Sequence, residues 1–296
     1  MGTYLITGGT GRIGTAFTHA MVAKGHTVRL GTRSPQGTSA QIRQAFGPGR
    51  VEPVAMSIDD QDSLDRAFQG CEGALLVAPF GDMDQWHAAM SQAAKKAQLQ
   101  HLIKVSVTGA RGPDSDPPPG RIPSMHWAGE EHVRASGIPY TIIRPTIFAQ
   151  HFLGLSPALF SRGDSHIHLP TGSTQVAFLD CRDIGICAAE LLSSSTLRTQ
   201  FAGTAFELTG STAISAQEIA HLLSQIAGRP IEHVDGVEAF SKHAQALNVP
   251  DLIKGIYIEA SEGWFSEVHD QEFQEIVGRH TTSFAKFAYD HRFFFA

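Results

Sequence analysis

Cysteine is scarce in this chain of 296 residues, which contains only Cys71, Cys181 and Cys187. The number is odd and no two are spaced as C-x-x-C, so neither a disulfide scaffold nor a zinc site is indicated, and a reducing compartment is the default. Long hydrophobic runs are missing too. No stretch approaches the ~18 apolar residues of a membrane span, and no secretion-signal pattern opens the sequence. We therefore expect a cytoplasmic protein that does not bind membranes.

Short apolar runs alternate with helical segments through the first half of the chain. Continuous apolar strands joined by helices are typical of a parallel sheet that is covered on both faces. The sequence therefore predicts an α/β fold with a Rossmann-type doubly wound parallel sheet. The loop 109–123 is too rich in Pro and Gly for a helix or a central strand. The expected strands are 4–7, 27–30, 51–56, 74–77, 101–106 and 140–143, and the expected helices are 12–24, 63–68, 84–98 and 126–136.

A glycine-rich turn, TGGTGRIG at residues 7–14, follows the first expected strand and opens the first helix. It has the form G-x-x-G-x-x-G. Gly8 would allow the tight turn, Gly11 would let the backbone approach a pyrophosphate, and Gly14 would permit close helix–sheet packing. The amide N–H groups and the dipole of the helix favour an anion there, so this turn predicts dinucleotide binding. Further candidates for cofactor binding in the turn are Thr10, Arg12 and Ile13.

Acidic residues are absent from residues 1–51, although six Lys or Arg residues fall there and the net charge of the chain is only −6. An NAD site usually has an acidic residue about 20 positions after the glycine turn, which accepts a hydrogen bond from the ribose 2′-hydroxyl. This chain has Arg33 and Ser34 instead. Arg33 can pair with a 2′-phosphate, and Arg12 or Ser34 can add donors. NADP(H) is therefore the favoured cofactor and NAD(H) the second candidate, while the plain alternative for Arg33 is an exposed surface arginine.

The second half of the chain is less regular. A short strand and a capped helix are expected at 178–186. Ser215 and Glu218 have the spacing of a capping box, which opens a helix that ends near Gly228. The expected domains are an NAD(P)-binding Rossmann domain formed by 1–150 with 175–210, and a smaller C-terminal substrate-covering region formed by 151–174 with 211–296.

Beyond the glycine turn, the chain contains LVAPF at 76–80, KVSVTG at 104–109, SGIPYTIIRP at 136–145, FLDCRDIG at 178–185, FELTG at 206–210 and GRP at 228–230. Together with ITGGTGRIG at 6–14, these segments resemble the NmrA-like atypical short-chain dehydrogenase/reductases. The resemblance covers most of the chain to about residue 230 and is looser beyond. Its motifs are specific for the fold and the cofactor but are poor guides to the substrate.

By position, the resemblance implies cofactor contacts from the segments that follow the third to sixth strands. For each apolar residue among them, core packing is a plain alternative. The implied residues are Asp59 at the adenine, Ala78, Pro79 and Phe80 along the ribose and nicotinamide, Ser106, Val107 and Thr108 beside the reaction centre, and Pro145, Thr146, Ile147 and Phe148 at the nicotinamide.

A tyrosine followed four residues later by a lysine, the proton-donating pair of ordinary short-chain dehydrogenases, is absent from the chain. On the helix where that pair is expected, His126 and Glu130 lie one turn apart on the same face. His126 could donate a proton, with Glu130 orienting it or raising its pKa. Alternatively, His126 only shapes a pocket while Glu130 pairs with Arg134 on the helix surface. Thr108 is the third catalytic candidate.

These features favour an NADPH-dependent reductase that transfers hydride to a small, largely apolar electrophile. Quinones, azo groups, iminium ions and conjugated carbonyls make small demands on a protein acid. The resemblance also leaves a different class open, a non-catalytic redox sensor that binds the dinucleotide and controls a partner protein. A sugar-nucleotide epimerase or dehydratase is disfavoured because it needs the missing pair. We expect no metal site, because His166 and His168 lack a third ligand at metal spacing, no direct nucleic-acid binding, and a monomer or homodimer.

Overall fold

The computed structural model describes residues 1–46, 49–79, 81–116 and 118–296. The chain divides into two compact units. The first unit consists of Met1–Arg144, Arg182–Glu207 and Glu275–Gly278, and the second consists of Pro145–Cys181, Leu208–Gln274 and Arg279–Ala296.

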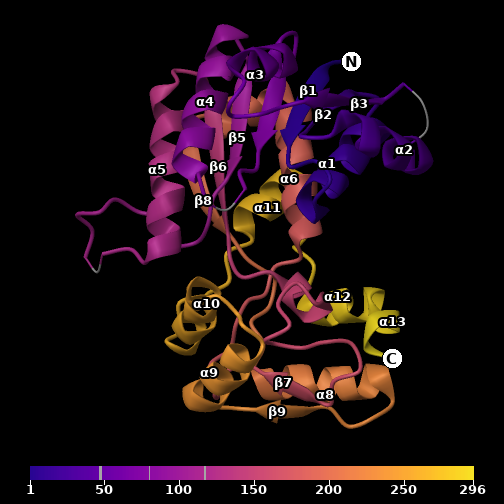
Figure 1. Cartoon of the computed structure of the whole chain (residues 1–296), viewed down its shortest axis with the longest axis vertical. Helices are drawn as coiled ribbons and strands as arrows, with labels where there is room; N and C mark the ends of the chain where they lie inside the picture. The colour runs from indigo at the N-terminus through magenta and orange to yellow at the C-terminus, as the bar shows by residue number, and fades with distance from the viewer. Residues whose placement is uncertain (47–48, 80, 117) are drawn as a thin grey trace. The chain divides into compact units, whose positions relative to one another are not determined.

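A seven-stranded sheet forms the frame of the first unit, in the order β3–β2–β1–β4–β5–β6–β8 (Figure 1). The pairings that join β3 through to β6 are all parallel. In the register, Thr7 lies beside Gly31 and Leu76 beside Lys104, so the carboxyl ends of these strands lie at one edge of the sheet. The predicted Rossmann-type parallel sheet is therefore confirmed. The strands are β1 (Thr3–Thr7), β2 (Thr27–Thr32), β3 (Val51–Ala55), β4 (Gly73–Leu76), β5 (His101–Val105), β6 (Tyr140–Pro145) and β8 (Thr204–Leu208).

Helices pack against this sheet and against one another. Residues of α3, α4 and α5 form one buried cluster with Leu5 and Leu102 of the sheet. Elsewhere α6 packs tightly on α1: a Cβ added to Gly185 would lie 2.5 Å from the carbonyl oxygen of Ile13, so a larger residue would separate the two helices. The helices of this unit are α1 (Arg12–Ala23), α2 (Pro35–Phe46), α3 (Gln61–Phe68), α4 (Met83–Lys96), α5 (Arg121–Ala135), α6 (Cys181–Ser193) and α7 (Ser195–Gln200).

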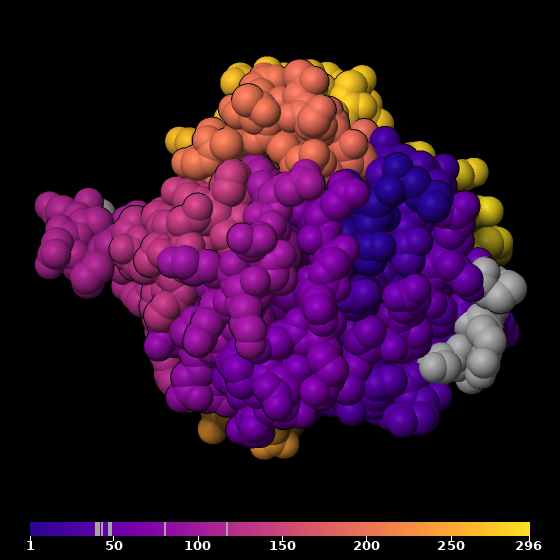
Figure 2. Space-filling model, turned by 90° about the horizontal axis from the view of Figure 1, so that it is seen from above, coloured from indigo at the N-terminus to yellow at the C-terminus, as the bar shows by residue number. Residues whose placement is uncertain are grey.

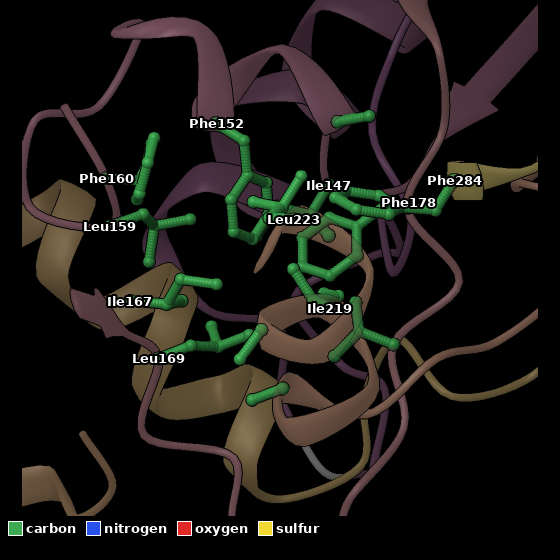
Figure 3. Packing of buried hydrophobic residues seen from close by; sticks show 14 of the residues in the cluster. Ile147, Phe152, Leu159, Phe160, Ile167, Leu169, Phe178, Ile219, Leu223 and Phe284 are labelled. Atoms are coloured by element: carbon green, nitrogen blue, oxygen red, sulfur yellow. The ribbon is translucent and has the colours of Figure 1, made fainter. Parts of the chain in front are cut away.

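Buried aromatic side chains fill the core of the second unit (Figure 3). The Phe152 ring lies edge-on to two others, with its centroid 5.3 Å from that of Phe178 and 5.1 Å from that of Phe284. This edge-to-face arrangement is favourable for aromatic quadrupoles. The elements of this part of the chain are η1 (Ala149–Leu153), β7 (His166–His168), α8 (Ala216–Ala227), β9 (Glu232–Val234), α9 (Val237–Ala246), α10 (Asp251–Ser261), α11 (Gln271–Val277), α12 (Phe284–Asp290) and α13 (Arg292–Phe295).

The predicted capping box is confirmed at the start of α8, where the Ser215 and Glu218 side chains each accept a hydrogen bond from the other residue's backbone N–H. The helix ends at Gly228, whose φ of 65° is the left-handed conformation that favours glycine.

Two helix starts differ from the sequence expectations. Helix α5 begins at Arg121, inside the loop 109–123, because Pro123 occupies the first helical turn, where a backbone N–H has no partner within the helix. Helix α2 was not predicted, since its Gly, Thr and Ser residues have low helix propensity. The signal that could have found it is Ser34-Pro35, a typical helix start. The rest of the loop projects from the surface beside α5 (Figures 1 and 2).

Helices α4 and α5 approach closely at Gly129, where an added Cβ would lie 2.6 Å from Nδ1 of the buried His87. We predict that Gly129→Ala destabilises the protein by about 1–3 kcal/mol through overpacking. The matched control is Gly255→Ala in α10, where an added Cβ meets no atom within 4 Å. That substitution should instead stabilise by about 0.5–1 kcal/mol, because alanine is the better helix former. Urea unfolding of both variants measures whether the free energy of unfolding falls in one and rises in the other. Equal changes in the two variants would contradict the close approach of Gly129 to His87.

Candidate active site

The glycine-rich turn joins β1 to α1 at the point where the strand order of the sheet reverses. Gly8 has a left-handed φ of 68°, and its carbonyl oxygen accepts a hydrogen bond from the Gly11 amide at 3.0 Å. A Cβ added to Gly14 would lie 2.5 Å from Cα of Gly9 and 2.8 Å from the carbonyl oxygen of Gly8. The helix therefore starts directly against the turn, which only a residue without a side chain allows.

Two hydrogen bonds of the Thr7 side chain connect this turn to the residue that follows the neighbouring strand β4. The Thr7 hydroxyl donates to the carbonyl oxygen of Val77 at 2.9 Å and accepts from the Val77 amide at 2.7 Å. The half-buried Ala78 and the exposed Pro79 follow at once, so these two predicted cofactor residues are held beside the glycine turn. Phe80, the third residue predicted there, lies outside the described residues.

The start of α1 is open to an anion. The helix begins at Arg12 with no side-chain cap and no acidic residue in its first turn, so no capping side chain satisfies its first amide N–H groups. Arg12 and Arg33 are both exposed, and neither guanidinium forms a hydrogen bond or ion pair with another described residue. Unsatisfied amides beside two unpaired cations fit the phosphates of a dinucleotide, including a 2′-phosphate.

The other predicted adenine-side residues also follow the carboxyl ends of strands. Ser34 is exposed after β2, and its amide donates to the Thr32 hydroxyl at 3.2 Å. Asp59 is exposed in a turn after β3, where its amide donates to the Ser57 hydroxyl at 3.3 Å. Of the predicted turn residues, Thr10 is exposed and Ile13 is half-buried.

A buried carboxylate lies behind the end of β5. The Glu130 side chain of α5 is completely buried and is gripped by the Arg144 guanidinium of β6, with Nε 3.0 Å from Oε1 and Nη2 2.7 Å from Oε2. Arg134 donates to Oε2 at 2.7 Å, and the Ser106 hydroxyl donates to Oε1. Burial raises the pKa of Glu130, but the hydrogen bonds from Arg144 and Ser106 outweigh it and leave that pKa below its ordinary value. The carboxylate is therefore ionised at neutral pH.

Next to this network lie three basic side chains, and none of them forms an ion pair with an acidic side chain among the described residues. The Lys104 ammonium group of β5 lies 3.4 Å from Nδ1 of His126 and 3.3 Å from the carbonyl oxygen of Val105. Nδ1 of His87, on α4, must carry a proton, because it contacts the carbonyl oxygen of Met83 at 2.7 Å. The Nε2 atom of His87 is buried and has no hydrogen-bond partner among the described residues.

These surroundings disfavour positive charge on all three groups. Burial lowers the pKa of Lys104 to about 7, although the charge of Glu130 opposes the shift. Burial and the charge of Lys104 lower the pKa of His87 to about 3. Burial, followed by the charges of Lys104 and His87, holds the pKa of His126 well below its ordinary value. Both histidines are therefore neutral at physiological pH, while Lys104 titrates there.

The expectation that Glu130 raises the pKa of His126 is wrong, since that pKa is lowered. The physical reason is that the two side chains have different partners. The Glu130 carboxylate binds Arg144 and Ser106, while the His126 imidazole contacts Lys104. The alternative pairing of Glu130 with Arg134 is present, but the carboxylate in it is completely buried and only the Arg134 side chain reaches the helix surface.

The remaining predicted residues divide between the units. In the first, the half-buried Val107 precedes Thr108, whose hydroxyl donates to the carbonyl oxygen of Arg144 at 3.3 Å. In the second, Pro145 is buried at the end of β6 and Phe148 is half-buried before η1. Thr146 and Ile147 between them are buried, and the Thr146 hydroxyl has no hydrogen-bond partner in the described part of the chain.

Two residues of this site, Lys104 and Arg144, were not among the predicted ones. Both interrupt apolar strands, in the segments HLIKV and YTIIRP. A charged residue inside a buried strand of a parallel sheet is the signal that could have found them, because such residues are rarely buried unless paired.

Among the described residues, no helix is long and apolar enough to cross a membrane. In the same part of the chain, no group of three or more His, Cys, Asp or Glu side chains is placed to hold a metal ion.

With this geometry in place, the relatives of the chain can be compared. The sequence model of the NmrA-like family matches residues 2–287. The chain belongs to the NmrA-like family. The resemblance drawn from the motifs is thereby confirmed, and it extends well beyond residue 230.

Three similar proteins match over nearly their whole lengths. The NAD(P)H azoreductase of Xenophilus azovorans is 28% identical over 295 residues, 97% of each chain. The (4-alkanoyl-5-oxo-2,5-dihydrofuran-3-yl)methyl phosphate reductase of Streptomyces griseus subsp. griseus is 29% identical over 298 residues, 99% of each. The NADPH-dependent quinone oxidoreductase of Escherichia coli, solved with NADPH, superposes with a TM-score of 0.81 at 22% identity, over 98% of this chain and 99% of that one. The last likeness concerns the fold.

The buried ion-pair network around Glu130 generates a stability prediction. Glu130→Gln should destabilise the protein by about 3–5 kcal/mol at pH 7, because it leaves the partly buried Arg144 without its counter-charge. The control is Glu131→Gln, one residue along the helix, whose exposed pair with Arg134 should contribute about 0–1 kcal/mol.

The pH dependence gives a second readout of the same variants. Since the folded-state pKa of Glu130 is lowered, its stabilisation is full above the unfolded-state pKa near 4.5 and is lost as the pH falls through the folded-state value. Urea unfolding at pH 7 and below pH 4.5 should therefore show a difference between wild type and Glu130→Gln that narrows in acid. A difference at pH 7 no larger than that of Glu131→Gln would contradict the network.

Proposed function

We propose that the protein is an NADPH-dependent reductase that transfers hydride to a small, largely apolar electrophile of the quinone, azo, iminium or conjugated-carbonyl type. The observation that carries the proposal is the glycine turn with its uncapped helix start and the guanidinium groups of Arg12 and Arg33, which have no partner among the described residues. The names of the relatives add support, because an azoreductase and another reductase match the chain from end to end.

The cofactor preference follows from charge. The 2′-phosphate of NADPH needs cationic donors and would be repelled by a carboxylate at the position that follows β2. Arg33 and Ser34 occupy that position, and residues 1–51 contain no acidic residue. NADPH is therefore bound more tightly than NADH.

When bound, the reduced nicotinamide supplies the hydride, so the protein has to supply binding, orientation and one proton. His126 is the proton donor in this proposal. It is half-buried, and its Nε2 atom forms no hydrogen bond with another described residue. The missing Tyr–Lys pair agrees with an electrophile that accepts hydride readily. The protein acts in the cytoplasm, as a monomer or homodimer.

The role of Arg33 in choosing the cofactor can be measured directly. Arg33→Ala should weaken NADPH binding about tenfold to a hundredfold, the loss of one charge-assisted hydrogen bond, and leave NADH binding unchanged. The control is Arg66→Ala on α3, whose exposed side chain lies 3.7 Å from Asp60 and should not affect either cofactor. Calorimetric titration of both variants decides the matter. Equal losses for NADPH and NADH would contradict a contact with the 2′-phosphate.

Turnover tests the reaction itself. Purified protein with NADPH and a panel of quinones, azo dyes and iminium compounds should oxidise NADPH with at least one acceptor. His126→Ala should lower kcat about 10²–10⁴-fold while leaving the Kd of NADPH unchanged, the loss expected for a general acid. Tight NADPH binding with no oxidation by any acceptor would overturn the reductase and leave the redox sensor.

A further inference from the structure

The least expected residue of the first unit is a lysine with no exposed surface. Lys104 lies at the fourth position of β5, between the register partners Leu76 of β4 and Ile142 of β6. Its side chain is completely buried, and its Nζ atom reaches only Val105 and His126 among the described residues. Burying an amine is unfavourable unless it is paired or neutral, and a methionine would fill similar space without that cost.

The charged and titratable side chains around the Lys104 amine belong to α4, α5 and β6. Glu130 of α5 favours the protonated amine, while Arg134 of α5 and Arg144 of β6 disfavour it. His87 of α4 and His126 of α5 are the neighbouring imidazoles, and both feel the charge of Lys104. The amine therefore lies between the ion pairs of Glu130 and two neutral imidazole rings. Burial in these surroundings lowers the pKa of Lys104, so the amine gives up its proton more readily than an exposed lysine.

His126 cannot act as a simple acid in these surroundings. Its low pKa keeps the ring neutral at physiological pH, so no imidazolium is present to donate. A neutral imidazole is a very weak acid on its own. It can release the proton on one ring nitrogen only if the other nitrogen takes up a proton at the same time. The group that lies against the other nitrogen, Nδ1, is the amine of Lys104, 3.4 Å away.

We propose that Lys104 is a positioning residue that supplies, through the imidazole of His126, the proton that the substrate takes up. The proposal deepens the proposed function and rests on it. While the amine is protonated it has no lone pair, so it can only donate to Nδ1, and His126 must then carry its own proton on Nε2. Lys104 thus fixes the tautomer that presents a donor to the substrate.

The proton steps balance. When bound, the reduced nicotinamide would supply the hydride, and with it the two electrons, that reduce the electrophilic atom of the substrate. The bond between Nε2 and its proton breaks as the substrate heteroatom takes the proton, and the Nζ proton of Lys104 moves to Nδ1. His126 remains neutral with its tautomer exchanged, and Lys104 becomes a neutral amine. Water then protonates Nε2, and the proton on Nδ1 returns to Lys104, which has no exposed surface of its own.

The test compares Lys104→Met with wild type, and Lys96→Met serves as the control because its exposed amine pairs with Asp65 on the surface. The first readout needs no cofactor. Nitrogen-15 NMR of the His126 ring should show the Nε2–H tautomer in wild type below pH 7. In Lys104→Met the ring should become a mixture of tautomers, and in Lys96→Met it should match wild type. An unchanged tautomer in Lys104→Met would overturn the proposal.

The second readout is the pH profile of turnover. With a pKa of about 7 for Lys104, kcat of wild type should fall about tenfold for each pH unit above 7, because a decreasing fraction of Lys104 is protonated. Lys104→Met should show a kcat about 10²-fold lower, without this pH dependence between pH 6 and 9, at an unchanged Kd for NADPH. A variant with the kcat and profile of wild type would overturn the role of Lys104 while leaving the reductase intact. Absence of turnover in wild type would overturn the reductase instead.

Discussion

The ion pairs of the buried Glu130 carboxylate are the interaction on which the structure behind the end of β5 depends. An ionised group without exposed surface is tolerated only if its charge is matched, and here the donors come from Ser106 just after β5, from α5 and from β6. The fork of Arg144 fixes the helix against the strand that carries it. Because His126 lies one turn before Glu130 on the same helix, the same contact places its imidazole over Lys104. The Glu130–Arg144 ion pair therefore helps to position the His126 imidazole without contacting it.

The first unit uses cations in two opposite ways. The guanidinium groups of Arg134 and Arg144 are paired with the buried Glu130 carboxylate, so their charges are balanced within the fold. Arg12 and Arg33 are exposed and unpaired among the described residues, beside helix amides that also lack partners. Unsatisfied donors at a helix start are what a phosphate requires. The charges near the end of β5 are therefore paired within the protein, while those after β1 and β2 are left for a ligand. This arrangement agrees with a dinucleotide whose phosphates bind after β1 and β2.

The sheet and the glycine turn were predictable because each rests on local pattern. Apolar runs mark the strands, and the turn at Gly8–Gly14 has a motif whose context is visible within one strand and one helix. The partners of His126 were not predictable, since the spacing of His126 and Glu130 on one helix face suggested a pair that the fold does not form. Lys104 lies 22 residues before its imidazole and Arg144 lies 14 residues after its carboxylate. Such contacts depend on the register of β5 and β6 beneath α5, which no local spacing encodes.

We propose that the dinucleotide bound at the glycine turn gives up hydride to a substrate. Anaerobic single-turnover stopped-flow measures this most directly, using NADPH deuterated at C4 on one face or the other and mixed with an accepting quinone or iminium compound. The account predicts that oxidation is slowed by deuterium on one face only, because a bound nicotinamide presents a single face. Tight binding of both labelled cofactors with no oxidation by any acceptor would contradict it and would identify the protein as a dinucleotide sensor.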